Sequence, residues 1–181
     1  TDLRPYHNHS KILSMALSDG NRTVAFAWDH PEAGWTKSQK ASLTDLFKEF
    51  LFKSKTKFAH NLNMELEWIS HFFGKDLIDD CSWGDTMGQA YLLDTRKGVL
   101  NLDALVLINF GLHLKSLSNL NTTKCIEYPL IGYGNSKTAL LPYNALDAKY
   151  CIRLAKVQRQ HLASEGIPEE PYIRFVRVVK S

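Results

Sequence analysis

The chain has 181 residues, 44% of them hydrophobic, and a formal net charge of +3, which gives one globular domain enough apolar side chains for a core. It contains no run of about 18 apolar residues and no apolar signal segment in its polar first ten residues, so we expect neither a membrane span nor an export signal. We therefore expect a single cytoplasmic domain over residues 1–181, with its widely spaced cysteines as reduced thiols.

Two short strands are expected between Lys11 and Ala27, on either side of the turn sequence Ser18-Asp19-Gly20-Asn21. After a loop over residues 31–34, Thr36 and Gln39 have the spacing of a capping box and predict the start of a helix. Apolar residues at three- and four-residue steps predict its buried face: Leu43, Leu46, Phe47, Phe50 and Leu51.

Strands and helices then alternate along the chain. Lys57-Phe58-Ala59 predicts a buried strand, and a helix that Gly74 ends follows it. A second short strand is expected over residues 81–85, followed by one helix around residues 87–93 and another over 102–111. Residues 115–137 have the composition of a loop, and a long helix is expected from near Pro142 towards Gly166. This order predicts an α/β fold with a mixed sheet flanked by helices.

Three segments carry side chains suited to chemistry. In the first, His60-Asn61 ends the predicted strand and Glu65 follows in the first turn of the next helix. The second begins at Asp85-Thr-Met and continues to Tyr91-Leu-Leu-Asp94. In the third, Tyr143 and Asp147 are four residues apart and project from one helix face.

These segments, in this order, resemble the tyrosine subclass of the DEDD exonuclease superfamily. The closest likeness is to the 3′→5′ proofreading domain of family A, phage-type DNA polymerases, and it runs from Thr1 to about Leu154. The resemblance implies a ribonuclease H-like fold. It also implies a single-stranded DNA 3′ end as substrate and a covalently linked polymerase domain as partner, with the basic tail of residues 168–181 leading into it.

The resemblance further implies a role for each matching residue. Hydrolysis of a phosphodiester uses two Mg²⁺ or Mn²⁺ ions about 4 Å apart, bound by carboxylates. Asp147 and Glu65 match the metal-binding acids, and Tyr143 matches the residue that orients the attacking water. Four residues match positions near the terminal nucleotides: Asn61, Met64, His60 and Leu3. Asp85 matches an acid that supports the site.

The chain departs from the family pattern at two places. The family's first motif, Asp-x-Glu on a central strand, is expected just before Thr1, so two of four metal-site acids and that strand are absent from the sequence. As it stands, the chain is expected to bind at most one cation weakly. Glu65 also stands where the family usually has Asp, which moves the carboxylate by about 1.5 Å.

Each residue alone also has a structural explanation. Asn61 and Asp85 are good helix caps, and Tyr143 suits the edge of a core. Arg96 and Lys97 fit contacts to a phosphate backbone and a solvated loop equally well. The histidines outside the motif are expected at the surface: His7, His9, His30, His71, His113 and His161.

Three functions remain open at this point. The first is a metal-dependent exonuclease that removes mismatched 3′-terminal nucleotides from DNA. The second is an exoribonuclease of the same superfamily, against which the Asp85-Thr-Met sequence argues. The third is a catalytically inactive domain that binds DNA or supports a polymerase.

Overall fold

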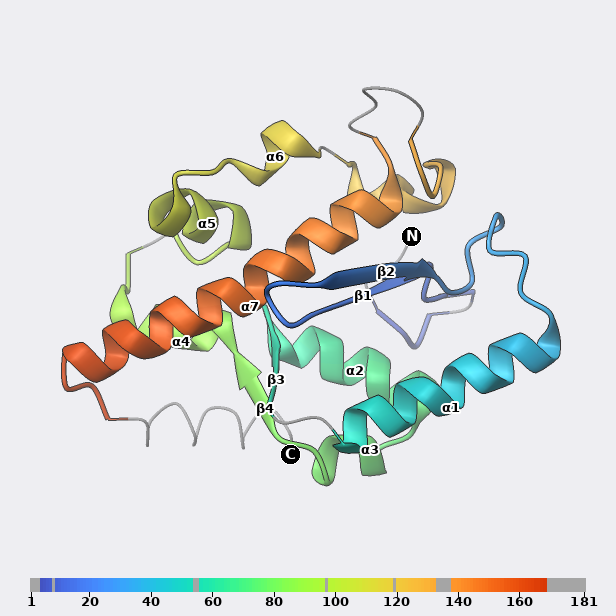
Figure 1. Ribbon diagram of the computed structural model, residues 1–181, viewed down its shortest axis with the longest axis horizontal. Helices are drawn as coiled ribbons and strands as arrows, with labels where there is room; N and C mark the ends of the chain where they lie inside the picture. Colours follow the sequence, from blue (N-terminus) through green and yellow to red (C-terminus); the bar gives the residue numbers. More distant parts are fainter. Residues whose placement is uncertain are drawn as a thin grey trace.

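The computed structural model describes residues 4–7, 9–53, 56–96, 98–118, 120–132 and 138–168, and a β-hairpin is its first regular element (Figure 1). Strands β1 (Ser14–Ser18) and β2 (Thr23–Ala27) pair antiparallel, as predicted. Asp19 Oδ1 accepts hydrogen bonds from the backbone N–H groups of Asn21 and Arg22, both at 2.7 Å. Gly20, with φ of 94°, completes the turn in a conformation that favours glycine.

Helix α1 (Lys37–Lys53) begins at the predicted capping box. The Thr36 N–H donates to Gln39 Oε1 at 3.0 Å, and the Gln39 N–H donates to Thr36 Oγ1 at 3.2 Å. The predicted apolar face is partly wrong: Phe47 and Leu51 are buried, whereas Leu46 is 62% exposed. The reason is that α1 lies at the edge of the fold and buries only a narrow stripe.

The second pair of strands is parallel. β3 (Lys57–Ala59) lies beside β4 (Trp83–Asp85), with Ala59 opposite Asp85. Helices α2 (Leu62–Phe73) and α3 (Asp76–Asp79) connect the two strands, and α4 (Thr86–Leu93) follows β4 directly. The two strands, α2 with Gly74 at its end, and α4 agree with the sequence prediction, whereas the short helix α3 was not predicted.

The remaining elements are helical. They are α5 (Leu102–Phe110), α6 (Leu114–Leu117), the 3₁₀ helix η1 (Thr122–Glu127) and α7 (Leu140–Ser164). The expectation of a loop over residues 115–137 is therefore wrong for α6 and η1. Local capping stabilises η1, because the Asn121 side chain accepts a hydrogen bond from the Thr123 N–H at 3.1 Å.

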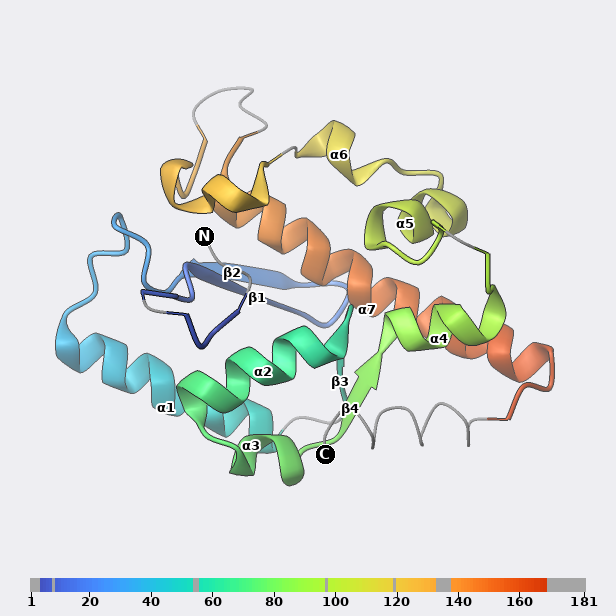
Figure 2. The ribbon, with the colours of Figure 1, turned by 180° about the vertical axis from the view of Figure 1, so that it is seen from behind.

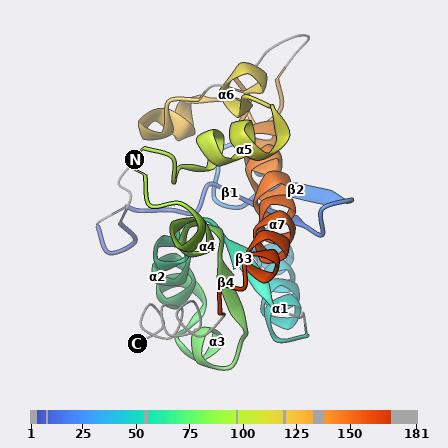
Figure 3. The ribbon, with the colours of Figure 1, turned by 90° about the vertical axis from the view of Figure 1, so that its left-hand side faces the viewer.

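Helix α7 crosses the molecule beside the hairpin and links it to the parallel pair β3 and β4 (Figures 1 and 2). Near its start, Asn144 Nδ2 donates to Ser14 Oγ at 2.7 Å, and farther along Arg153 Nε donates to the Gly20 carbonyl at 3.1 Å. Figure 3 shows β3 and β4 between α2 and α7. The helix therefore contacts both pairs of strands and orients one relative to the other.

An aromatic core holds the hairpin against α1 and α2. The Trp28 ring lies 5.3 Å from that of Phe73, which lies 4.8 Å from that of Phe47. His30, expected at the surface, is only 4% exposed, and its Nδ1 accepts a hydrogen bond from the Glu32 N–H at 3.2 Å. No helix in the described ranges is long and apolar enough to cross a membrane.

The fold is mixed α/β, as predicted, with one antiparallel and one parallel pair of strands. The expected single mixed sheet is not formed by the described residues, which make two separate two-stranded sheets. Within the described part of the chain, β1 and β3 thus each have one strand neighbour. A strand between them, which the resemblance expects, is not contributed by these residues.

Candidate functional site

The carboxyl ends of β3 and β4 lie side by side, and Asp85 joins them. Its Oδ1 accepts hydrogen bonds from the Met87 N–H at 2.9 Å and from the Asn61 N–H at 3.1 Å. The first bond caps α4, which confirms the predicted capping role. The second fixes the turn between β3 and α2. Since Asp85 is only 1% exposed, its place in the structure is support rather than contact with a ligand.

Asn61 occupies the N-cap position of α2 in the left-handed conformation, with φ of 65°. Its side chain makes no capping hydrogen bond, so the expected capping role is wrong. Asparagine tolerates this conformation better than most residues, which explains its use here. The turn directs α2 away from the end of β3 and places Met64, 38% exposed, and Glu65 in the first helical turn.

His60 lies half-buried between β3 and α4. Its Nδ1 lies 2.9 Å from Thr86 Oγ1, and the ring also bonds the Leu100 carbonyl. Burial lowers the pKa of His60, against the opposing effects of Asp85 and this carbonyl, and so favours the neutral imidazole. Because protein groups engage the ring, the geometry favours a positioning role over the predicted contact with the substrate.

Tyr143 and Asp147 lie on one face of α7, and their side chains are hydrogen-bonded to each other. The pKa of Asp147 is raised to about 6, chiefly by burial and to a smaller extent by the charges of Asp103 and Glu65, while the Tyr143 bond acts in the opposite direction. Burial and the Asp147 charge raise the pKa of Tyr143 to about 12. The phenol is therefore protonated at neutral pH and can donate to Asp147 or to a bound water.

Glu65 brings a second carboxylate towards this face from α2. Its side chain is exposed to solvent, and partial desolvation by neighbouring protein atoms raises its pKa. The charge of Glu65 raises the pKa of Asp147, which lies on α7, far away in the sequence. The structure thus keeps Tyr143 and Asp147 together on α7 and places Glu65 within electrostatic range of Asp147, so these three residues predicted to be catalytic lie in one region.

Asp103, in the first turn of α5, is a further acid near this group, and its charge raises the pKa of both Tyr143 and Asp147. Sequence reasoning missed it. An acid in the first turn of a helix is ordinarily explained by the helix dipole, and the sequence carries no signal that α5 packs against α7.

Asp147 and Glu65 offer few ligands for a metal ion. Carboxylate oxygens are the ligands that Mg²⁺ and Mn²⁺ prefer, so the donor chemistry of Asp147 and Glu65 fits such an ion. Among the residues that the structure describes, no three Asp, Glu, His or Cys side chains are close enough together to hold a metal. Leu3, predicted to contact the last bases, lies outside the described residues.

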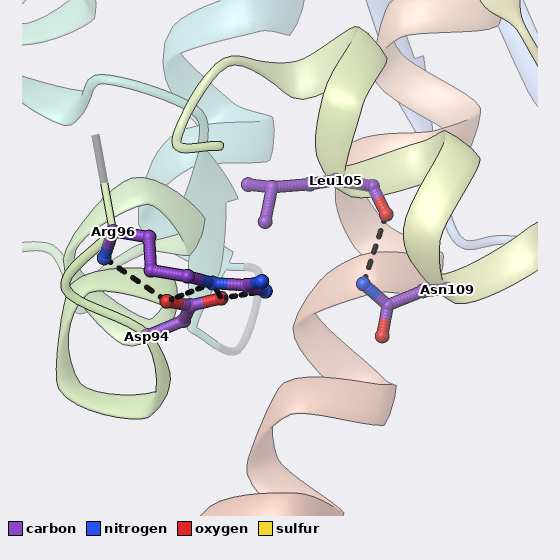
Figure 4. Close-up of polar contacts among 4 residues, drawn as sticks. All are labelled: Asp94, Arg96, Leu105 and Asn109. Atoms are coloured by element: carbon purple, nitrogen blue, oxygen red, sulfur yellow. Dashed lines mark hydrogen bonds and ion pairs between the residues drawn. The ribbon is translucent and has the colours of Figure 1, made fainter. Parts of the chain in front are cut away.

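The second polar segment ends in an ion pair at the surface. The Arg96 guanidinium donates to both carboxylate oxygens of Asp94, at distances of 2.6 to 3.0 Å (Figure 4). This bond raises the pKa of Arg96 and lowers that of Asp94. The Asp94 carboxylate neutralises the positive charge of Arg96, which a contact with phosphate requires. Of the two interpretations of Arg96, a solvated loop therefore fits the structure better than a phosphate contact.

No family model, curated protein or solved structure matches this chain.

Proposed function

We propose that the chain is a metal-dependent 3′→5′ exonuclease domain that removes mismatched 3′-terminal nucleotides from DNA for a linked polymerase. One observation carries the proposal. Glu65 on α2 and the Tyr143–Asp147 pair on α7 interact electrostatically beside the carboxyl ends of β3 and β4. In α/β proteins, ligands bind at the carboxyl ends of parallel strands.

Each residue has a distinct part in the hydrolysis. Asp147 and Glu65 are the carboxylates that would hold Mg²⁺ or Mn²⁺. When bound, such an ion supplies an activated water and stabilises the negative charge that develops on the leaving oxygen. The neutral Tyr143 phenol, fixed by its bond to Asp147, orients the attacking water.

The surface beside these residues suits a single-stranded 3′ end. The Asn61 side chain makes no capping bond, and Met64 presents an exposed apolar surface in the same turn of α2. The amide suits hydrogen bonds to a base or sugar, and the thioether adapts to different bases. A mismatched end is cheaper to unpair than a matched one, which favours its entry.

The test is a nuclease assay with Mg²⁺ or Mn²⁺, using the chain and the natural protein that carries it. The substrates are single-stranded DNA, matched and mismatched primer–templates, and RNA. Asp147→Ala is compared with Asp45→Ala, a change of an exposed acid on α1. In the natural protein we expect release of nucleoside 5′-monophosphates from DNA, faster at a mismatch, and its loss in Asp147→Ala only, whereas the present chain, with two of the four family acids, should release little or none.

Other outcomes separate the remaining functions. Equal activity in Asp147→Ala and the parent would refute the assignment of the site. Preference for RNA would identify an exoribonuclease. DNA binding without hydrolysis in the natural protein would identify the inactive, DNA-binding domain.

A further inference from the structure

The solvent side of α2 carries a row of aromatic side chains next to the candidate site. The rings of Trp68 and Phe72 are stacked, with centroids 5.5 Å apart and planes at 6°, and His71 meets Phe72 edge-on at 4.9 Å. Trp68 and Phe72 are only half-buried and His71 is exposed, whereas Phe73 is buried in the core. Met64, 38% exposed, lies one helical turn before Trp68 and therefore on the same face.

The turn that precedes the hairpin extends this row. Tyr6 is 65% exposed, and its ring meets that of His71 edge-on at 5.4 Å. Two hydrogen bonds hold the turn, because the Ser10 N–H donates to the His7 carbonyl at 3.0 Å and Ser10 Oγ donates to the Arg4 carbonyl at 2.8 Å. We call the resulting row the aromatic track, and its residues are Met64, Trp68, Phe72, His71 and Tyr6.

The same turn is basic. Between residues 4 and 11 the sequence contains Arg4, Lys11 and two histidines, and no acid. The side chains of Arg4 and Lys11 are exposed. Single-stranded nucleic acids are bound in this way, with bases stacked on aromatic rings and phosphates beside cationic side chains. The charge and the rings of this surface are therefore complementary to an unpaired strand.

We infer that the aromatic track binds the unpaired bases of a DNA strand just upstream of the 3′-terminal nucleotide at the candidate site. The inference rests on the proposed function for the identity of the strand and on the ring contacts for its geometry. Met64 and Phe72 are about 12 Å apart along the helix axis, a length that suits a few successive bases. Stacking needs no particular base, since every base has a face that stacks, and removal of any mispaired nucleotide requires this tolerance.

The test is the binding of fluorescein-labelled oligothymidylate to the chain, followed by fluorescence anisotropy in EDTA so that no hydrolysis occurs. Tyr6→Leu and His71→Leu remove exposed rings and keep apolar side chains. Phe52→Leu is the matched control, because Phe52 is an aromatic residue 54% exposed on α1. We expect each track variant to weaken binding roughly fivefold or more, with parental Tm, and the control to leave binding unchanged.

An abasic oligonucleotide of the same length separates stacking from attraction to phosphates and needs no variant. The parent should bind oligothymidylate more tightly than the abasic strand, and Tyr6→Leu should narrow the difference. Equal affinity of the parent for the two strands, or unchanged affinity for oligothymidylate in both track variants, would overturn the inference. Tighter binding of oligouridylate than of oligothymidylate would overturn it too, by assigning the surface to RNA.

The nuclease assay on the natural protein distinguishes this inference from the proposed function. DNA binding that depends on the aromatic track, without any hydrolysis, would refute the exonuclease function and support the track. Hydrolysis of single-stranded DNA with a parental KM in both track variants would support the function and overturn the track.

Discussion

The backbone N–H of Asn61 donates a hydrogen bond of 3.1 Å to the buried carboxylate of Asp85, which joins the ends of two parallel strands. The same oxygen caps α4 through Met87. One side chain thus sets the directions in which α2 and α4 leave the sheet. Glu65 depends on this bond for its place in the first turn of α2.

Replacement of Asp85 is therefore expected to destabilise the fold. Asp85→Ala removes a helix cap and leaves the Asn61 N–H without this acceptor, and should lower the free energy of unfolding by roughly 2–4 kcal/mol. Urea unfolding followed by circular dichroism measures the loss. Asp45→Ala, on the exposed side of α1, is the control and should change stability by less than about 0.5 kcal/mol. A similar small loss for Asp85→Ala would contradict the capping role.

The stability of the metal-free chain should fall as the pH rises from about 4 to 7. The pKa of Asp147 is about 6 in the folded protein and near 3.8 when unperturbed, so the folded state binds the proton more tightly than the unfolded state. Ionisation of Asp147 consequently costs stability across this window, by at most roughly 3 kcal/mol above pH 6. Urea unfolding at several pH values in EDTA should show a flatter dependence for Asp147→Asn. An unchanged pH dependence in that variant would mean that Asp147 is not the group responsible.

Tyr143→Phe should slow hydrolysis while leaving the fold and cation binding almost intact. The change removes only the hydroxyl that donates to Asp147 and orients the water, so kcat should fall roughly tenfold to a hundredfold with little change in KM. Loss of the hydrogen bond should also raise the pKa of Asp147, because that bond lowers it. Tyr150→Phe, on the same helix, is the control. Parent-like kcat in Tyr143→Phe would exclude the water-orienting role.

Glu65 should be needed for cation binding, and its neighbour Glu67 should not. Glu65→Gln removes one of two carboxylates at the site and should weaken Mn²⁺ binding by at least roughly tenfold. Mutation of a residue that only hydrogen-bonds to a metal ligand already lowers metal affinity by about this factor. Glu67→Gln, two residues farther along α2, faces another direction and serves as the control. Isothermal titration with Mn²⁺ compares the two. Glu65→Asp should retain binding, and a larger effect in Glu67→Gln would assign the ligand to Glu67.

Local sequence signals predicted most individual elements. The turn at Asp19-Gly20, the capping box of Thr36 and Gln39, and the cap at Asp85 each depend on hydrogen bonds between residues close in the chain. Such bonds form whatever the rest of the fold does, which is why the sequence alone determined them. The same locality explains why Tyr143 and Asp147 were placed on one helix face.

Long-range packing decided the rest. The exposure of Leu46, the burial of His30 and the left-handed turn at Asn61 follow from which surfaces meet, and periodicity does not contain that information. The packing of α5 on α7 has the same origin, since Leu105 and Leu154, far apart in the chain, are buried in one cluster. The sequence by itself determined which residues have the chemistry of a site. Only the tertiary structure, by packing α5 against α7 and placing β3 and β4 between α2 and α7, decided which of their charges interact, because electrostatic coupling depends on distance in space and not along the chain.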